Sequence, residues 1–172
     1  MYQPRHVANA LTQKAKHAGV LLSQSRLQNM LYFMHGCYSV WHEEPLLPEV
    51  FEAWISGPTI DSIARSFNEL MPELHELSAN RNGLVIRPPK SDNLFWIALD
   101  TVWEYFSKFS DSQLRDMAIC NGSPAQQLIA DNKTGDTIRQ EAIMSYFQTI
   151  TSLPEHVLRI EDNVIHLDFS RG

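Results

Sequence analysis

The chain has few cysteines, few glycines and no long apolar run, and each shortage excludes a class of protein. Its two cysteines, Cys37 and Cys120, form no C-x-x-C pair, so no disulfide framework is expected. Its 7 glycines include no G-x-G-x-x-G or P-loop pattern, which leaves a nucleotide cradle unsupported. The longest stretch without Asp, Glu, Lys or Arg, residues 27–42, is shorter than the roughly 20 apolar residues of a membrane span. We therefore expect no contact with a membrane.

Basic charge is also scarce. The chain carries 14 Lys and Arg against 20 Asp and Glu, which gives a formal net charge of −6. Phosphate neutralisation needs clustered Lys and Arg. The densest basic groups are small, one near the N-terminus and one in a turn-rich segment: Arg5, Lys14, Lys16, Arg81, Arg87 and Lys90. We expect no direct binding of nucleic acid, and a helix-turn-helix among the short helices stays as a minor alternative.

An apolar leader is absent from the first residues. Residues 1–6 contain no apolar h-region, so the sequence predicts no secretory signal. Two unpaired cysteines suit a reducing compartment. Together these features predict a cytoplasmic protein.

The overall composition is typical of one globular domain. Apolar residues make up 44% and charged residues 20% of 172 residues, close to the globular average of about 45–50% and about 25%. The length fits one domain of roughly 150 residues. We therefore treat 1–172 as a single domain with enough chain to bury a core.

The strongest helical pattern runs from Ser23 to Trp41. Ser23 is a suitable N-cap, and a wide apolar stripe follows at spacings of three and four. We expect this helix at the centre of the core. Gly36 lies inside it, where glycine costs up to about 1 kcal/mol relative to alanine, so we expect close packing against a neighbouring element.

Other helical patterns make the predicted fold class mainly α. They cover 4–18, 95–110 and 123–132, a segment that begins at Thr59, one capped by Asp111 or Ser112, and one that begins at Gly135–Asp136. Val50–Trp54 is expected to be either a short strand or an irregular buried segment, and Leu84–Ile86 is a candidate short strand. A hairpin-like extension is expected over 157–169. The prediction is a compact helical domain with one or two small β-hairpins, one of them C-terminal.

No residue set predicts a metal or a cofactor. His35, Cys37 and His42 are close in sequence, but they lack the ligand spacings of structural zinc. His35 and Cys37 point about 200° apart on a helix at about 100° per residue. A buried histidine and a core cysteine are the preferred interpretation.

No catalytic set is predicted either. The sequence contains neither G-x-S-x-G nor S-x-x-K. Cys120 precedes a helix N-terminus, which can lower a thiol pKa, but a small residue packed in a helix turn is the preferred interpretation. A small cysteine or metal-dependent hydrolase stays as a distant alternative to a non-enzymatic protein.

Two sequence blocks carry a family resemblance. The first, at 26–33, reads R-L-Q-N-M-L-Y-F and is followed by Gly36. The second is Pro45-Leu46 leading to F-E-A-W-I-S-G-P-T at 51–59. Together they resemble the Panacea domain family, also called the SocA-like antitoxins, whose members look like K-L-Q-K-L-L-Y-Y, then G-x-P-L-F, then E-A-W-x-x-G-P-V. The resemblance covers roughly residues 6–150.

The chain also departs from that family. Many members carry T-H near Ala118–Ile119 and a tryptophan after the proline that corresponds to Pro124. This chain keeps Gly122-Ser123-Pro124 but has Ala125 next. Any role of the missing histidine and tryptophan is therefore not carried over.

The resemblance implies a non-enzymatic, phage-associated antitoxin or immunity protein. Family members neutralise a co-encoded toxin by direct binding or by delivering it to a protease, so the implied partner is a cognate toxin or effector, with a protease as a further partner. A prophage-associated adaptor without a toxin is the main alternative.

Six residues are the candidate partner-binding residues. At the end of the long helix, Trp41 with Glu43 and Glu44 offers an aromatic anchor beside two carboxylates for a basic partner. In the second block the candidates are Trp54, Gly57 and Pro58. For the latter three, a turn packed onto the core is an equally good interpretation.

Overall fold

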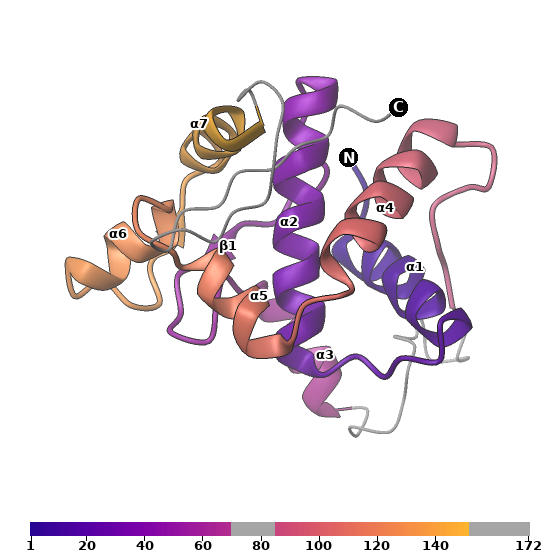
Figure 1. The fold of residues 1–172 in the computed structure, drawn as a ribbon, viewed down its shortest axis with the longest axis horizontal. Coiled ribbons are helices and arrows are strands. Elements are labelled where there is room, and N and C mark those ends of the chain that lie inside the picture. The colour runs from indigo at the N-terminus through magenta and orange to yellow at the C-terminus, as the bar shows by residue number, and fades with distance from the viewer. Residues whose placement is uncertain (70–84, 152–172) are drawn as a thin grey trace.

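The computed structural model describes residues 1–69 and 85–151, and the predicted mainly α class is confirmed (Figure 1). The side chains of 67–69 and 151 are outside the description. In chain order the elements are α1 (Pro4–His17), α2 (Gln24–His42), β1 (Phe51–Glu52), α3 (Asp61–Glu69), α4 (Asn93–Phe106), α5 (Asp111–Ala118), α6 (Pro124–Ala130), β2 (Thr137–Ile138) and α7 (Gln140–Thr151).

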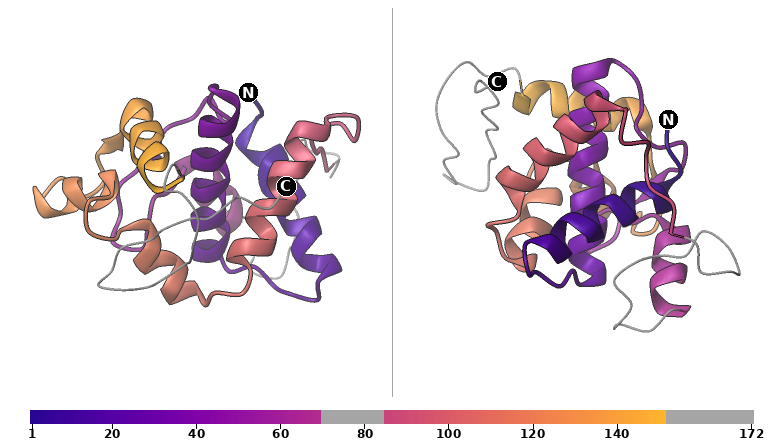
Figure 2. Two further views of the ribbon diagram at one scale, coloured as in Figure 1. Left: turned by 45° about the horizontal axis from the view of Figure 1, so that its top comes forward. Right: turned by 90° about the vertical axis from the view of Figure 1, so that its right-hand side faces the viewer.

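Helix α2 is the centre of the molecule, as its apolar stripe predicted. It packs against α1, α3, α4, α5 and α7, and it stands upright among them in Figures 1 and 2. Every residue from Arg26 to Cys37 is buried. The predicted N-cap of this helix is present, because the Ser23 hydroxyl accepts the Arg26 backbone N–H at 3.0 Å. Among the described residues, no helix is long and apolar enough to cross a bilayer.

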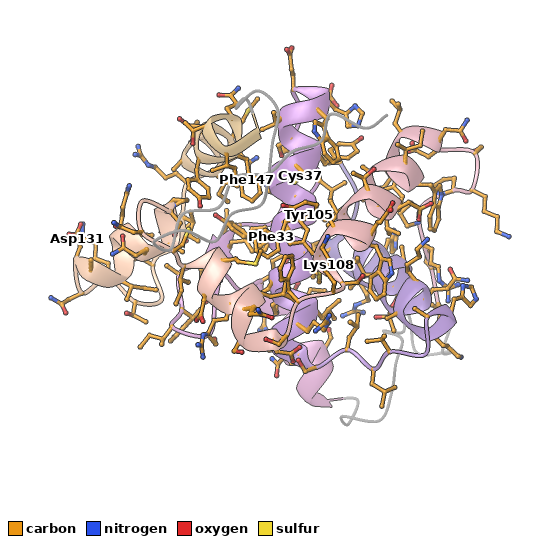
Figure 3. The ribbon with its side chains drawn as sticks, viewed as in Figure 1. Phe33, Cys37, Tyr105, Lys108, Asp131 and Phe147 are labelled. Carbon is orange, nitrogen blue, oxygen red and sulfur yellow. The ribbon has the colours of Figure 1, made fainter. Side chains whose placement is uncertain are left out.

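Aromatic rings fill the space around α2 (Figure 3). The rings of Phe33 and Phe106 are stacked, with centroids 4.1 Å apart, and Phe33 also lies 6.4 Å from Phe147 of α7. The predicted close approach at Gly36 is confirmed, because a Cβ there would lie 2.3 Å from the Phe147 ring. The missing side chain therefore lets α7 pack directly on α2.

A narrow β ladder joins segments that are distant in sequence. Strand β1 lies within the segment Val50–Trp54 and pairs with β2 in antiparallel register, Phe51 opposite Ile138. On its other side Glu52 exchanges two backbone hydrogen bonds with Thr59, at 2.8 and 3.0 Å. The prediction that Thr59 caps a helix is therefore wrong: its backbone belongs to the ladder, and α3 begins two residues later.

Two predicted helix starts are also corrected. The N-cap of α5 is Ser110, not Asp111 or Ser112, because Ser110 and Gln113 form a reciprocal capping box. The last helix begins at Gln140 rather than at Gly135–Asp136. Residues 135 and 136 instead form backbone hydrogen bonds with Ala53, which draws the chain into the ladder.

The remaining helix predictions agree with the structure within a few residues. Ser123 and Pro124 act as the predicted N-cap and first-turn proline of α6. Asp92 caps α4, which therefore begins two residues before the predicted start. Val85 and Ile86 have no regular secondary structure, so that strand prediction is wrong for the described part. The predicted hairpin 157–169 lies outside the described residues.

Candidate functional site

The structure separates the six candidate residues into two places along α2. Trp54, Gly57 and Pro58 lie in the loop 53–60, which contacts α2 near its N-terminal end through Gln28. Trp41, Glu43 and Glu44 lie at the other end of the helix. At a rise of 1.5 Å per residue, Gln28 and Glu43 are about 22 Å apart. The two groups therefore form two surfaces rather than one.

A buried amide of α2 fixes the loop 53–60. The Gln28 side chain donates from Nε2 to the Ile60 carbonyl and accepts the Ile60 N–H at Oε1, both at 3.0 Å. Gln28 and Ile60 are both buried, so water does not compete for these bonds. A buried amide with both ends satisfied rigidifies its surroundings.

Gly57 lets the loop approach α2 closely. Its φ of 110° lies in a region that side chains rarely adopt, and a Cβ would lie 2.1 Å from Oδ1 of Asn29. Asn29 is fully buried and donates to the Ser25 hydroxyl at 3.4 Å. Gly57 and Pro58 are themselves buried. These two candidates hold the loop in place and are not available as contact surface.

Trp54 is the exposed part of this loop. Its indole N–H donates to Glu52 at 2.9 Å, and its ring packs over Gly135, where an added Cβ would lie 3.3 Å from it. The side chain is held in one orientation while 41% of the residue stays exposed. Ile55 beside it is 67% exposed and was missed from the sequence. An apolar pair between a strand and a Gly-Pro turn is the signal that could have identified it.

A groove of about 320 Å³ lies beside the Trp54 ring. Its charged lining residues are two carboxylates, Glu52 and Asp61, and Asp61 pairs with Arg65 at 2.8 Å on the helix surface. Gln24, Ser25 and Thr59 supply polar groups to the same groove. The loop therefore combines an exposed apolar tip with an acidic groove.

The opposite end of α2 is less apolar at its surface. Glu43 adopts a left-handed conformation with a φ of 55° that ends the helix, and both Glu43 and Glu44 are exposed. Trp41 is only half-buried and packs against the core. Burial raises the pKa of the neighbouring Tyr38, and the charge of Glu44 raises it further. This surface is a patch of negative charge with a partly covered aromatic ring.

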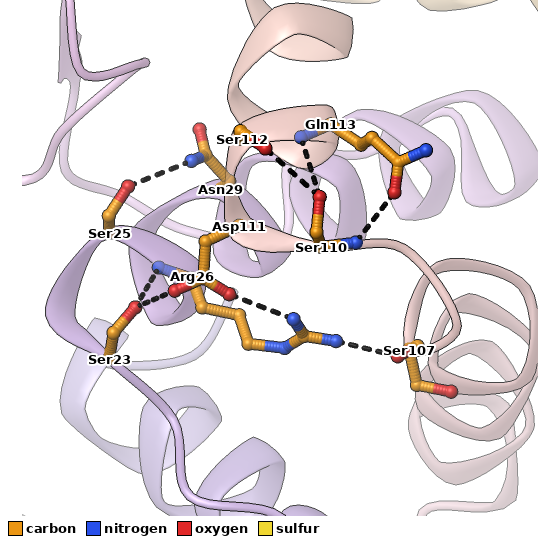
Figure 4. A network of polar contacts seen from close by, with 9 residues as sticks. All are labelled: Ser23, Ser25, Arg26, Asn29, Ser107, Ser110, Asp111, Ser112 and Gln113. Atoms are coloured by element: carbon orange, nitrogen blue, oxygen red, sulfur yellow. Dashed lines mark hydrogen bonds and ion pairs between the residues drawn. The ribbon is translucent and has the colours of Figure 1, made fainter.

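A polar network fixes the first turn of α2 to the connection between α4 and α5 (Figure 4). The buried Arg26 guanidinium donates to Asp111 at 2.8 Å and to the Ser107 carbonyl at 2.6 Å. Ser23 donates to the other oxygen of Asp111. Burial favours the neutral acid, but the bonds from Ser23 and Arg26 and the Arg26 charge outweigh it and lower the pKa of Asp111. The network therefore stabilises the start of α2, close to Gln28, which holds the loop 53–60 in place.

His35 and Cys37, which were considered as metal ligands, are both buried in the core. His35 accepts the Leu47 N–H at Nδ1, 3.3 Å away, so its Nε2 donates to Gln140 at 2.6 Å. Burial lowers the pKa of His35 to about 4, although the Gln140 bond opposes this. Burial raises the pKa of Cys37 far above its usual value. Within 1–69 and 85–151, no group of three or more His, Cys, Asp or Glu could hold a metal ion.

Cys120 is buried in the turn before α6, as the structural interpretation expected. Its Sγ lies 3.0 Å from the Tyr146 hydroxyl. Burial raises the pKa of the Cys120 thiol, and the bond to Tyr146 opposes this only in part. A thiol that stays protonated is a poor nucleophile.

Comparison with known proteins finds one relevant likeness. Over 126 residues, the chain is 29% identical to a protein named Antitoxin SocA from Caulobacter vibrioides (strain NA1000 / CB15N). The aligned region covers 70% of this chain and 66% of the relative, so the chain spans about two thirds of the length of the relative that it matches. No family model and no solved structure matches the chain.

Proposed function

We propose that this chain neutralises a cognate toxin by binding it directly. Its likeness to Antitoxin SocA supports membership of the SocA-like antitoxin family. The observation that carries this proposal is the rigid loop that exposes Trp54 and Ile55 beside an acidic groove. In this proposal the chain is a non-enzymatic protein that works in the cytoplasm and needs no cofactor.

The physics of protein interfaces supports the Trp54 loop as the main contact. A few large anchors dominate binding energy, and tryptophan is the residue most often found in that role. An anchor that is already held in its bound orientation loses less entropy on association. The Glu52 hydrogen bond and the Gly135 contact hold Trp54 in this way.

Charge complements the apolar anchor. Glu52 and Asp61 line the groove, and the chain has a net charge of −6. Such a surface accelerates encounter with a basic partner, and the acceleration weakens as salt is added. The proposed toxin therefore presents a basic surface with an apolar pocket for the indole ring.

The cluster Trp41, Glu43 and Glu44 is a second contact in this proposal. Its two exposed carboxylates suit a rim that guides the encounter, since the half-buried Trp41 offers less apolar area than Trp54.

The test pairs this protein with the product of the adjacent gene. Growth rescue on co-expression measures neutralisation, and surface-based kinetics measure association and dissociation. Trp54→Ala is expected to accelerate dissociation by at least about tenfold, as for an anchor residue. Glu43→Lys with Glu44→Lys is expected to slow association and reduce its salt dependence. Trp41→Ala is expected to have a smaller effect on dissociation.

Ile97→Ala is the matched control, because Ile97 is a large apolar residue that is 63% exposed and belongs to α4, none of whose residues lines the groove beside Trp54. It should leave both rates unchanged. Rates that stay the same in every Trp54, Trp41 and Glu43/Glu44 variant would contradict the proposed interface. Toxin that disappears on co-expression, rather than persisting in complex, would favour delivery to a protease over blocking.

A further inference from the structure

A second groove lies on a different face, between the C-terminal half of α1 and the start of α4, and the segment 85–92 closes it. Its volume is about 660 Å³. Helices α1 and α4 lie side by side in Figures 1 and 2 and contact each other. Its charged and aromatic lining consists of Lys14, His17, Arg87, Lys90, Trp96 and Asp100. None of these residues belongs to the surfaces described above.

The charge of this groove is opposite to that of the whole chain. The chain has a net charge of −6, yet Asp100 is the only acidic residue among the described lining residues. Asp100 is already paired with Lys14 at 2.7 Å. Lys90 is exposed and makes no ion pair with any described residue. The groove therefore has a local positive potential.

Helix stabilisation explains only part of this arrangement. Basic residues in the last turn of a helix complement its dipole, and that accounts for Lys14 and His17 in α1. It does not account for Lys90, which comes from a segment far away in the sequence. The dipole of α1 therefore does not explain why two separate basic segments meet at one groove.

Trp96 gives the groove a fixed apolar wall. Its indole N–H donates to the Pro89 carbonyl at 2.9 Å, and its ring meets Phe95 edge-on at 5.2 Å. The ring is half-buried, so one part supports the 85–92 segment and the rest lines the groove. An apolar wall beside positive charge suits a ligand that carries both features.

We propose that this groove binds an extended acidic segment of a protein, with carboxylates beside Lys90 and His17 and one large apolar side chain against Trp96. The charges favour a peptide over a nucleic acid. A nucleic acid needs a basic surface that continues along its backbone, whereas the basic residues of this groove belong to a chain with a net charge of −6. The inference is independent of the proposed antitoxin function, because it uses neither the Trp54 loop nor the end of α2.

The test is a titration of the isotope-labelled full chain followed by NMR. The probe is a short peptide of Asp and Glu with one central Phe, and a Lys version of the same peptide is the charge-reversed control. The chain has 4 tryptophans, so the indole N–H signal of Trp96 reports on the groove and that of Trp54 serves as an internal reference. The Trp96 signal is expected to shift, with the Trp54 signal unchanged, and binding should weaken as salt is added.

Lys90→Glu should weaken binding about five- to tenfold, because it replaces an attraction with a repulsion of similar size at the surface. The control Lys133→Glu makes the same change in net charge at an exposed site just after α6, outside the residues that line the groove, and should leave the affinity unchanged. Lack of saturation at millimolar peptide, equal loss in both variants, or tighter binding of a single-stranded oligothymidine than of the acidic peptide would overturn the proposal.

Discussion

Replacing Gly36 by alanine tests the packing of α7 on α2 with a single methyl group. The Cβ would lie 2.3 Å from the Phe147 ring, whereas carbon atoms in favourable contact are about 3.5–4.0 Å apart. The ring would have to withdraw by more than about 1 Å. It cannot do so freely, because Tyr32 lies edge-on at 5.4 Å between centroids and Phe33 at 6.4 Å.

Two opposing effects set the size of the change. Alanine is favoured over glycine inside a helix by about 1 kcal/mol. Overpacking a filled core typically costs about 1–3 kcal/mol, and more when the neighbours are held. The overlap here is severe and the ring is enclosed, so we expect Gly36→Ala to lower the free energy of unfolding by about 2 kcal/mol. For a chain of this size that is about 4–8 °C in the melting temperature.

Urea denaturation followed by circular dichroism measures this loss, and a double-mutant cycle with Phe147→Leu identifies its cause. Phe147→Leu alone creates a partial cavity and destabilises the chain. In the Gly36→Ala background the smaller side chain leaves room for the new methyl group, so the two costs should sum to clearly more than the cost of the double mutant. Costs that simply add, or a Gly36→Ala variant that is more stable than the parent, would refute the reasoning.

Four further predictions follow from the core and the loop anchor. Leu31→Ala, at a fully buried position, should cost about 2–5 kcal/mol in a denaturant melt. The free energy of unfolding should fall by about 3 kcal/mol between pH 6.5 and pH 4, because the pKa of His35 is lower in the folded chain than in the unfolded chain, so acid favours unfolding. A His35→Gln variant should lose that part of the pH dependence in the same melts. Gly57→Ala should destabilise the loop, seen as faster amide exchange at Ile60, because its Cβ would overlap Asn29. Elemental analysis should find no stoichiometric metal.

Local patterns predicted the helical part of this fold well. Ser23 and Ser123 cap helix starts by accepting the backbone N–H of the residue three positions on, and Pro124 occupies a first-turn position, so their roles can be read from neighbours in sequence. Gly36 was informative because a glycine inside an apolar helix is costly and therefore needs a reason. The central position of α2 followed from the width of its stripe.

Non-local pairing could not be predicted in the same way, whereas the cap of α5 had a local signature that was missed. Thr59 is a good N-cap by type, but its backbone pairs with Glu52, and Glu52 in turn pairs with Thr137. Ser110, Asp111 and Ser112 are all good caps by residue type, and the capping box that Ser110 forms with Gln113 decides between them.

The candidate site was predicted in part. Residues 51–59 were identified as a distinctive block, but sequence alone could not separate the exposed Trp54 from the buried Gly57 and Pro58. That distinction depends on Gln28 and Asn29, which lie a full block earlier in the chain.

The anchoring of the loop by Gln28 and Gly57 has a consequence for how such a protein diversifies. The contacts that shape the loop are made by buried side chains and backbone groups, whereas residues 54–56 at its tip are exposed. Substitutions at the tip are therefore expected to alter the exposed surface with little change in stability, whereas substitutions at the base are expected to disturb the core. The surface of this loop can thus change in single steps while the scaffold beneath it stays the same.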